Sequence, residues 1–355
     1  MARLSNLALF LPAQIRDQDM TRTVHLGQTT MHIPKALLRR TILSLIPFTL
    51  TLMGGETFGA TFANATFDPG TIDAGIPGFV GPDGLGTISP NNMVNPLFVD
   101  WATGFQDYLP APGVLDQWQT PERALGPVTG AFDGIVSLGE LTAEQIAAEV
   151  APGQITLTFD SPLQNGEGPD FAVFENGFGF ADTGTLFAEL AYVEVSTDGT
   201  HFLRFPSTSL TPEPLDPFGQ LDPTQVYNLA GKHVNNGVVL PDDQFVLASW
   251  GTPFDLEVLT EQAIAQPGQV DLNAINFVRI VDIPGSGDFV DAAGNPIYDP
   301  WPVPIPGSGG FDLEAVGVIN MRAVPEASTV LGLMLFSLSG LWVRGAQRRA
   351  RPEKT

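Results

Sequence analysis

Carboxylates placed at the ends of apolar runs are the residues of this 355-residue chain best suited to chemistry. Asp170 and Glu175 bracket the run 171–174, and Asp312 and Glu314 stand at the start of the run that continues to residue 319. Calcium takes about six to eight oxygen ligands, many of them carboxylates. If the strands carrying these residues are neighbours, the four side chains share one rim and can hold Ca²⁺. The open alternative is that Asp, Asn and Gly simply form turns here.

A second candidate metal site is the loop 288–299, in which four oxygen-bearing side chains fall among glycine and proline. Their spacing does not match the EF-hand loop, so this would be a different kind of calcium site. The alternative here is again that Asp and Asn simply form turns. The four residues are Asp288, Asp291, Asn295 and Asp299.

The same carboxylates support an enzyme hypothesis, because a glycosidase uses one carboxyl as acid and a second as nucleophile or base. Glu175 and Glu194 form the candidate pair, although Glu194 alternates with valines and can simply face solvent. A serine hydrolase is disfavoured because the chain lacks a Gly-x-Ser-x-Gly elbow. His201 and His233 have no partner motif for catalysis or zinc binding.

Tryptophans near Pro, Gly or Asp offer a binding hypothesis, because an exposed indole ring can stack on a sugar. Trp301, within the Asp-Pro-Trp-Pro sequence at 299–302, is the strongest candidate for a glycan contact, ahead of Trp101, Trp118 and Trp250. The alternative is a ring that covers the end of the fold. The phenylalanines are expected in the hydrophobic core.

The elements that must position these residues are mainly strands. Short runs rich in Val, Ile, Phe and Thr are separated by Gly, Pro, Asn and Asp, which predicts an all-β protein. One short helix is expected over 142–149, capped by Thr142 and ended by Pro152-Gly153. Asp198-Gly199 predicts a hairpin turn. The pattern favours a two-sheet, jelly-roll-like β-sandwich, with strands predicted at 154–160, 171–174, 190–196, 201–205, 276–282 and 313–319.

Charge separates the body of the chain from its ends. Residues 61–325 contain five Lys and Arg against 34 Asp and Glu, a net charge of −29. Such a surface repels nucleic acid and anionic membrane but attracts divalent cations, or it only maintains solubility. The chain has no cysteine, so neither disulfides nor thiolates are available.

Several segments of the body are distinctive when they are taken together. They are Gly168–Gly177, Ala191–Gly199, Leu229–Lys232, Gly251–Leu256, Val278–Asp282 and Gly310–Val316. On these segments the body resembles bacterial cell surface protein domains over roughly residues 128–320. The resemblance implies a secreted β-sandwich similar in outline to jelly-roll carbohydrate-binding modules, and it implies no established activity.

The last 32 residues combine a short polar motif, an apolar stretch at 330–343 and a basic end. The 14-residue stretch is shorter than the ~20 residues of a spanning helix, which favours a sorting helix over a permanent anchor. This tail resembles PEP-CTERM, which implies processing by exosortase in a Gram-negative bacterium, although alanine replaces the second proline. A plain membrane anchor is the alternative. The motif residues are Pro325, Glu326 and Ala327, followed by Arg348 and Arg349.

The front of the chain also predicts export. Lys35, Arg39 and Arg40 precede the apolar run 41–53, and Ala63-Asn64-Ala65 fits a leader cleavage site. Met31 is the expected true start. We therefore expect a leader region (1–65), an irregular extension (66–127), a β-sandwich (128–322) and a sorting tail (323–355). The partners expected are the secretion machinery, exosortase and an exopolysaccharide or other envelope component, with only transient inner-membrane contact through the tail.

Overall fold

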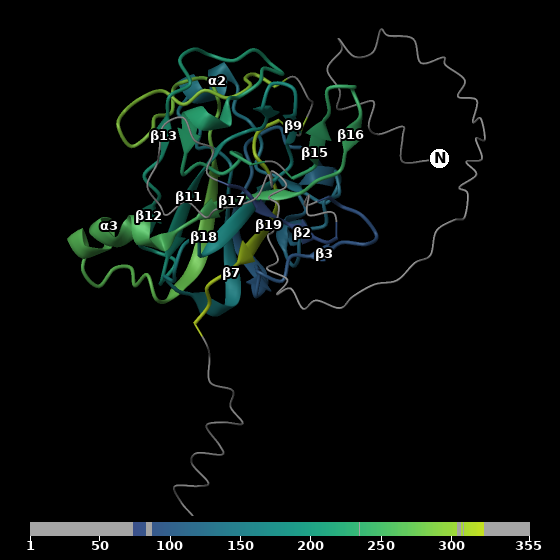
Figure 1. The fold of residues 1–355 in the computed structure, drawn as a ribbon. Helices are drawn as coiled ribbons and strands as arrows, with labels where there is room; N and C mark the ends of the chain where they lie inside the picture. Colours follow the sequence, from purple (N-terminus) through teal and green to yellow (C-terminus); the bar gives the residue numbers. More distant parts are fainter. Residues whose placement is uncertain (1–73, 83–86, 234, 304–306, 308, 323–355) are drawn as a thin grey trace, which may run out of the picture. The chain divides into compact units, whose positions relative to one another are not determined.

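The computed structural model describes residues 74–82, 87–233, 235–303, 307 and 309–322 (Figure 1). The chain divides into two units, Met1–Glu56 and Thr57–Thr355, and all described residues belong to the second. The predicted leader and sorting tail lie outside the described residues. Within the described part, no helix is both long enough and apolar enough to cross a membrane.

The largest sheet is antiparallel and has β19 near its centre. β19 pairs with β8, β4 and β6, and β8 pairs in turn with β17, which pairs with β1. Its strands are β1 (Ile76–Pro77), β17 (Trp250–Phe254), β8 (Phe171–Glu175), β19 (Asp312–Val318), β4 (Asp100–Trp101) and β6 (Val136–Ser137).

A second antiparallel sheet has five strands in the order β12-β11-β18-β7-β5. Its longest members, β18 and β7, pair with a bulge between residues 275 and 277. The strands are β12 (Leu203–Arg204), β11 (Ala191–Ser196), β18 (Ile275–Asp282), β7 (Gln154–Leu163) and β5 (Gly104–Leu109).

Three smaller sheets and two short helices complete the described part. The order β10-β9-β15-β16 forms a four-stranded sheet in which β9 and β15 are parallel, and the other two sheets are two-stranded. These strands are β10 (Thr185–Phe187), β9 (Phe178–Phe180), β15 (Gly237–Val239), β16 (Phe245–Val246), β13 (Thr208–Ser209), β14 (Val226–Tyr227), β2 (Phe79–Val80) and β3 (Met93–Val94). The helices are α2 (Ala143–Ala147) and α3 (Thr260–Ala265), with 3₁₀ turns at Asp116–Trp118, Pro121–Ala124, Pro223–Gln225 and Leu256–Leu259.

The main hydrophobic core draws side chains from both large sheets. Ile155 and Leu157 alternate along β7 and are fully buried, as the period of two predicts. Val193 of β11 belongs to the same cluster, together with Phe171 and Val173 of β8. Alternation along the strands therefore gives each large sheet one face that is packed against this core.

The all-β prediction is confirmed, and each predicted strand overlaps an observed one. The predicted helix begins as expected, because Thr142 and Gln145 form a reciprocal capping box. It ends at Ala147, earlier than expected, and Glu149 then takes a left-handed φ of 57°. The expectation of a single helix was wrong, because α3 also forms. It lacks a side-chain N-cap, so the sequence shows no start signal for it.

The segment predicted as an irregular extension, residues 66–127, contributes strands to both large sheets. β1 pairs with β17, β4 pairs with β19, and β5 pairs with β7. Strands on the two sides of the predicted boundary at residue 128 are therefore hydrogen-bonded to each other.

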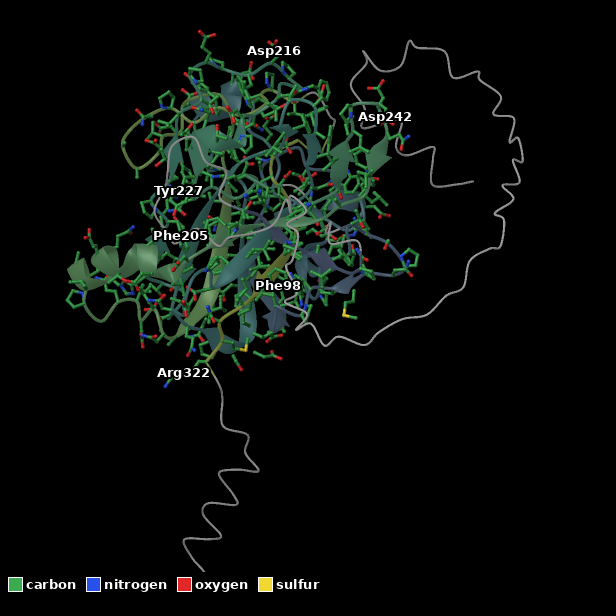
Figure 2. All side chains as sticks on the ribbon, in the orientation of Figure 1. Phe98, Phe205, Asp216, Tyr227, Asp242 and Arg322 are labelled. Atoms are coloured by element: carbon green, nitrogen blue, oxygen red, sulfur yellow. The ribbon has the colours of Figure 1, made fainter. Side chains whose placement is uncertain are left out.

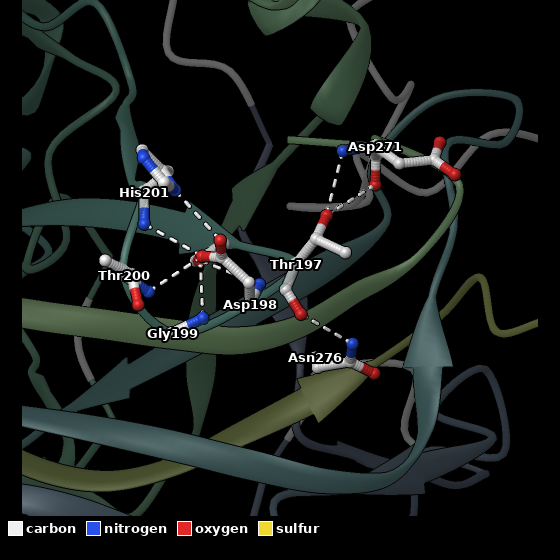
Figure 3. Close-up of polar contacts among 8 residues, drawn as sticks. Thr197, Asp198, Gly199, Thr200, His201, Asp271 and Asn276 are labelled. Atoms are coloured by element: carbon white, nitrogen blue, oxygen red, sulfur yellow. Dashed lines mark hydrogen bonds and ion pairs between the residues drawn. The ribbon is translucent and has the colours of Figure 1, made fainter. Parts of the chain in front are cut away.

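The predicted hairpin joins β11 to β12 through a turn organised by Asp198 (Figure 3). Its Oδ1 accepts hydrogen bonds from the backbone N–H groups of Thr200 (2.8 Å) and His201 (2.9 Å), and its Oδ2 lies 2.8 Å from His201 Nδ1. Gly199 supplies the positive φ, 74°, that this turn needs. These hydrogen bonds lower the pKa of Asp198, and they use both the backbone N–H and the ring Nδ1 of His201 within the turn.

Asp170, at the start of β8, joins three separate segments. Its Oδ1 accepts hydrogen bonds from Gly166 N (2.8 Å) and Asn320 Nδ2 (2.9 Å), and its Oδ2 accepts one from Leu256 N (2.7 Å). The side chain is fully buried. Without the carboxylate, the N–H groups of Gly166 and Leu256 would lose these hydrogen bonds, whereas Asn320 Nδ2 would keep a long contact to Pro169 O (3.4 Å).

Replacing Asp170 by alanine is predicted to lower the free energy of unfolding by about 3 kcal/mol, because buried donors without partners are costly. Urea denaturation of the purified protein measures this change. The control is Asp242→Asn, which removes a charge from an exposed position. Equal stability of the two variants would contradict the structural role of Asp170.

Candidate functional site

Six carboxylates converge where strands of the two large sheets begin and end. In the register of β8 and β19, Leu313 faces Glu175, so Glu175 lies beside Asp312. In the register of β11 and β18, Ala191 faces Asp282, so Asp282 lies near the start of β11. We call this group the carboxylate cluster: Glu140, Glu175, Glu189, Asp282, Asp299 and Asp312.

The residues leading into β19 hold three members of the cluster together. Gly310 N donates to Glu189 Oε1 (2.8 Å), and Phe311 N donates to Asp282 Oδ1 (2.8 Å). Asp312 follows directly. Gly310 has φ +86° and packs against the backbone at 139–140, where a Cβ atom would collide. A glycine is therefore required for the chain to bring these carboxylates together.

Two further backbone hydrogen bonds attach the remaining loop members. Leu190 N donates to Asp299 Oδ2 (2.7 Å), and Val303 N donates to Glu140 Oε2 (2.9 Å). A side chain at Gly285 would overlap the Asp299 carboxylate, so this glycine leaves room for it. The cluster is thus assembled from several loops as well as from strand ends.

Burial dominates the electrostatics of the cluster. Five members are at most 7% exposed, and Glu140 is partly buried. Burial, with a smaller contribution from neighbouring carboxylates, raises the pKa of four members well above ordinary values. Burial also raises the pKa of Asp312 and of Glu140 to about 7. These groups favour protons, or another positive charge, at neutral pH.

The structure brings together only part of the first predicted calcium site. Glu175 and Asp312 are neighbours, but Asp170 lies at the opposite end of β8, and a five-residue strand spans about 16 Å. Glu314 belongs elsewhere: its Oε1 accepts hydrogen bonds from Thr129 N (2.7 Å), Thr129 Oγ1 (2.6 Å) and Gly130 N (2.6 Å). Asp170 and Glu314 therefore do not share a rim with Glu175.

The loop 288–299 does not gather its four oxygen-bearing side chains around one point. Asp291 accepts hydrogen bonds from the backbone of Ser209, Ala293 and Asn295 and from Asn295 Nδ2, which makes it the centre of a turn. Asp288 is exposed and accepts from Ser286 Oγ. Asp291 and Asp299 are both buried, but of the four only Asp299 joins the carboxylate cluster.

Three members of the cluster were missed by sequence reasoning: Glu140, Glu189 and Asp282. Two of them had a visible signal, because Glu189 directly precedes a predicted strand and Asp282 ends another. Their proximity depends on the pairing of β11 with β18, which the sequence does not reveal.

The candidate glycosidase pair is not assembled. Glu194 lies on the outer face of β11, between the buried Val193 and Val195, and forms ion pairs with Arg204 (2.9 Å) and Arg279 (2.8 Å). Glu175 instead interacts with Asp312 and Asp299 in the cluster. A common substrate would therefore not meet Glu175 and Glu194 together in this arrangement.

The four candidate tryptophans are buried or half-buried. Trp101 packs in a core cluster with Phe98 (ring centroids 4.8 Å apart) and Phe174 (5.8 Å). Trp301 is half-buried, and its Nε1 donates to Leu141 O (3.1 Å). Part of the Trp301 side chain remains accessible to solvent, but its indole N–H already donates to the Leu141 carbonyl and is not free to bind a ligand.

Six phenylalanines form a separate surface on the four-stranded sheet, which we call the aromatic face. Registers place Phe178 opposite Phe187, and place Phe180 and Phe245 opposite Val239, so four rings share one side of the sheet. Phe132 and Phe218 pack onto these rings at 5.8 and 5.9 Å. None of the six belongs to the three hydrophobic core clusters, so they are exceptions to the expectation of core phenylalanines. That expectation holds for Phe98, Phe171, Phe174, Phe205, Phe254 and Phe311.

The aromatic face is partly open, and several acidic residues are close to its rings in the sequence. Phe178 is 9% exposed, Phe218 is 40% exposed, and the other four rings are half-buried. Figure 2 shows Asp242 at the tip of the hairpin that joins β15 to β16. Asp133, Asp182 and Asp216 each lie within two residues of a ring of the face, and its four strands contain no Lys or Arg.

No family model, no curated protein and no solved structure matches this chain. The sorting residues Pro325, Glu326, Ala327, Arg348 and Arg349 lie outside the described residues. Geometry and chemistry of the described residues are therefore the basis for a functional proposal.

The carboxylate cluster predicts an inverse dependence of stability on pH in metal-free protein. Asp312 and Glu140 have folded-state pKa values of about 7, above the usual values near 4. Their raised values stabilise the fold below about pH 4, and this contribution is lost as the pH rises through about 7. In EDTA, the free energy of unfolding should fall between about pH 5 and pH 8, on the order of 3 kcal/mol.

Urea denaturation at each pH measures this effect, and Asp312→Asn should reduce it, because the amide does not titrate. A free energy of unfolding that is constant or increases with pH would show that these carboxyls are not buried as described.

Proposed function

We propose that this chain is an exported, exosortase-sorted cell-surface or extracellular-matrix protein that binds or structures exopolysaccharide. The leader and the PEP-CTERM-like tail support export and sorting. The body has a jelly-roll-like sandwich architecture, supported by the core that both large sheets contribute to. Calcium stabilises this fold, as the acidic composition and the absence of disulfides suggest.

The observation that carries polysaccharide binding is the aromatic face. Its ring centroids are 5.3 to 6.4 Å apart, within the range of aromatic pairs that pack against each other. Such a platform can stack on the C–H faces of sugar rings, while nearby carboxylates accept hydrogen bonds from sugar hydroxyls. Phe218 is the most exposed ring and stacks on Phe187, so it is the expected first contact.

Charge selects the kind of polysaccharide. The aromatic face lacks basic side chains on its strands, and residues 61–325 carry a net charge of −29. A polyanionic glycan would be repelled. The ligand is therefore a neutral polysaccharide that offers hydroxyls and apolar ring faces.

Phe218→Ala is predicted to weaken binding of a neutral polysaccharide about tenfold, because the lost stacking is worth about 1.4 kcal/mol. Phe218→Tyr should retain binding. Affinity gel electrophoresis with neutral and with anionic polysaccharides measures the retardation. Leu109→Ala is the matched control, because it truncates another exposed apolar side chain, on β5.

Trp301→Phe should leave binding unchanged if the aromatic face carries it. Loss of retardation in Trp301→Phe but not in Phe218→Ala would place the glycan at Trp301 instead.

A carbohydrate-active enzyme is the second candidate, favoured by the raised pKa values in the carboxylate cluster, which suit a general acid. Glu175 would be the general acid, although it is only 1% exposed, and Glu194, the other residue of the candidate pair, forms ion pairs with Arg204 and Arg279 instead. Incubation with the bound polysaccharide should release no new reducing ends. Turnover that is abolished by Glu175→Gln, with folding intact, would establish the enzyme and overturn the pure binding role.

A further inference from the structure

Three oxygens of the carboxylate cluster are buried without any hydrogen-bond donor. They are Glu175 Oε2, Asp282 Oδ2 and Asp312 Oδ1, on side chains that are 1%, 0% and 7% exposed. Other oxygens of the same side chains do have donors: Asp282 Oδ1, for example, accepts a hydrogen bond from Phe311 N. A buried carboxylate oxygen without a donor is costly unless a proton or a cation neutralises it.

Ser137 adds an independent neutral oxygen at the same place. It faces Asp312 in the register of β6 and β19, its side chain lies beside the Asp312 carboxylate, and it is fully buried. Its Oγ has no well-formed hydrogen bond, although Ser137 and Asn176 lie close enough to Asp312 to act as weak donors that lower its pKa. The Ser137 carbonyl accepts a hydrogen bond from Tyr108 Oη (2.8 Å). A hydroxyl oxygen beside unsatisfied carboxylate oxygens is the mixture of ligands that calcium takes.

The basic side chains among the described residues are too few to neutralise the whole cluster. Arg204 and Arg279 are paired with Glu194, Arg123 lies over Trp118, and Arg322 is exposed. Lys232 is buried, with its Nζ 5.7 Å from the centre of the Tyr227 ring. Even one full positive charge from Lys232 leaves most of six carboxylates unneutralised.

We propose that the carboxylate cluster binds a divalent cation of the calcium type, with Glu175, Asp282 and Asp312 as charged ligands and Ser137 as a neutral one. This inference deepens the calcium stabilisation in the proposed function and does not depend on glycan binding. Among the described residues, no three Asp, Glu or His side chains already surround an ion position. Binding therefore requires these side chains to turn toward one another as the cation enters.

The ligand set favours calcium over other metals. The chain has no cysteine, and the cluster contains no histidine, so the soft or nitrogen ligands that zinc and copper prefer are missing. Magnesium requires a nearly ideal octahedron and keeps much of its water, which suits a dry, irregular group of oxygens poorly. Calcium accepts variable geometry and can replace the protons that the buried carboxyls otherwise hold.

A calcium titration of the purified protein, first stripped with EDTA, tests this site without any glycan. At about pH 7.5 the melting temperature should continue to rise with calcium concentration, because a ligand of the folded state stabilises by mass action. Elemental analysis should find bound calcium in the dialysed protein. Magnesium at equal concentration should have a much smaller effect.

Asp282→Asn and Asp312→Asn should each weaken calcium binding about tenfold or more, because each removes a charged ligand. In EDTA both variants should melt higher than the parent protein, because the substitution relieves repulsion in the cluster. The amide oxygen introduced by Asp282→Asn can still accept from Phe311 N. The melting temperature in EDTA thus distinguishes the loss of a calcium ligand from damage to the fold. Asp255→Asn makes the same charge change at the cap of the 3₁₀ turn 256–259 and should retain calcium affinity.

A melting temperature indifferent to calcium would overturn the proposal, as would equal responses to calcium and magnesium. Unchanged calcium affinity in both cluster variants would exclude these ligands. Because no polysaccharide is present, each of these failures leaves the proposed glycan binding to be judged separately.

Discussion

Concentrated negative charge in a region shielded from water is the constraint on which the rest of this structure depends. The core between the two large sheets requires β8, β19, β11 and β18 to meet in fixed registers, and those registers bring carboxylates from the strand ends together. Repulsion between charges grows as water is excluded. The fold is therefore compatible with neutral pH only if protons, Lys232 or a bound cation offset this charge.

A comparison of buried carboxylates in the same molecule explains why the cluster is special. Asp170 is as buried as the cluster members, yet both of its oxygens accept hydrogen bonds, and it connects separate segments. Glu175, Asp282 and Asp312 each keep an oxygen without a donor. Glu314 also keeps one oxygen, Oε2, without a donor, but it lies apart from the cluster. The gathering of three such oxygens in one place, and not burial alone, therefore identifies the part of the structure that needs a ligand.

Local patterns were predictable from the sequence, and long-range pairings were not. The alternation of Ile155 and Leu157 predicted β7, and Thr142 predicted the start of α2, because neighbouring residues decide both. The cluster depends on contacts between residues more than 90 positions apart, such as the pairing that brings Glu189 near Asp282. The sequence alone could not predict that these two residues are neighbours. The aromatic face was missed for a similar reason, because it requires the parallel pairing of β9 with β15.

Infrared difference spectroscopy of the carboxyl groups tests most directly whether the buried charge is neutralised as described. In EDTA near neutral pH, the protein should show the absorption of protonated carboxylic acids in a shielded environment. Calcium should remove this band and replace it with carboxylate absorption, with release of protons to the solvent. A spectrum without protonated carboxyls in EDTA, unchanged by calcium, would contradict the account.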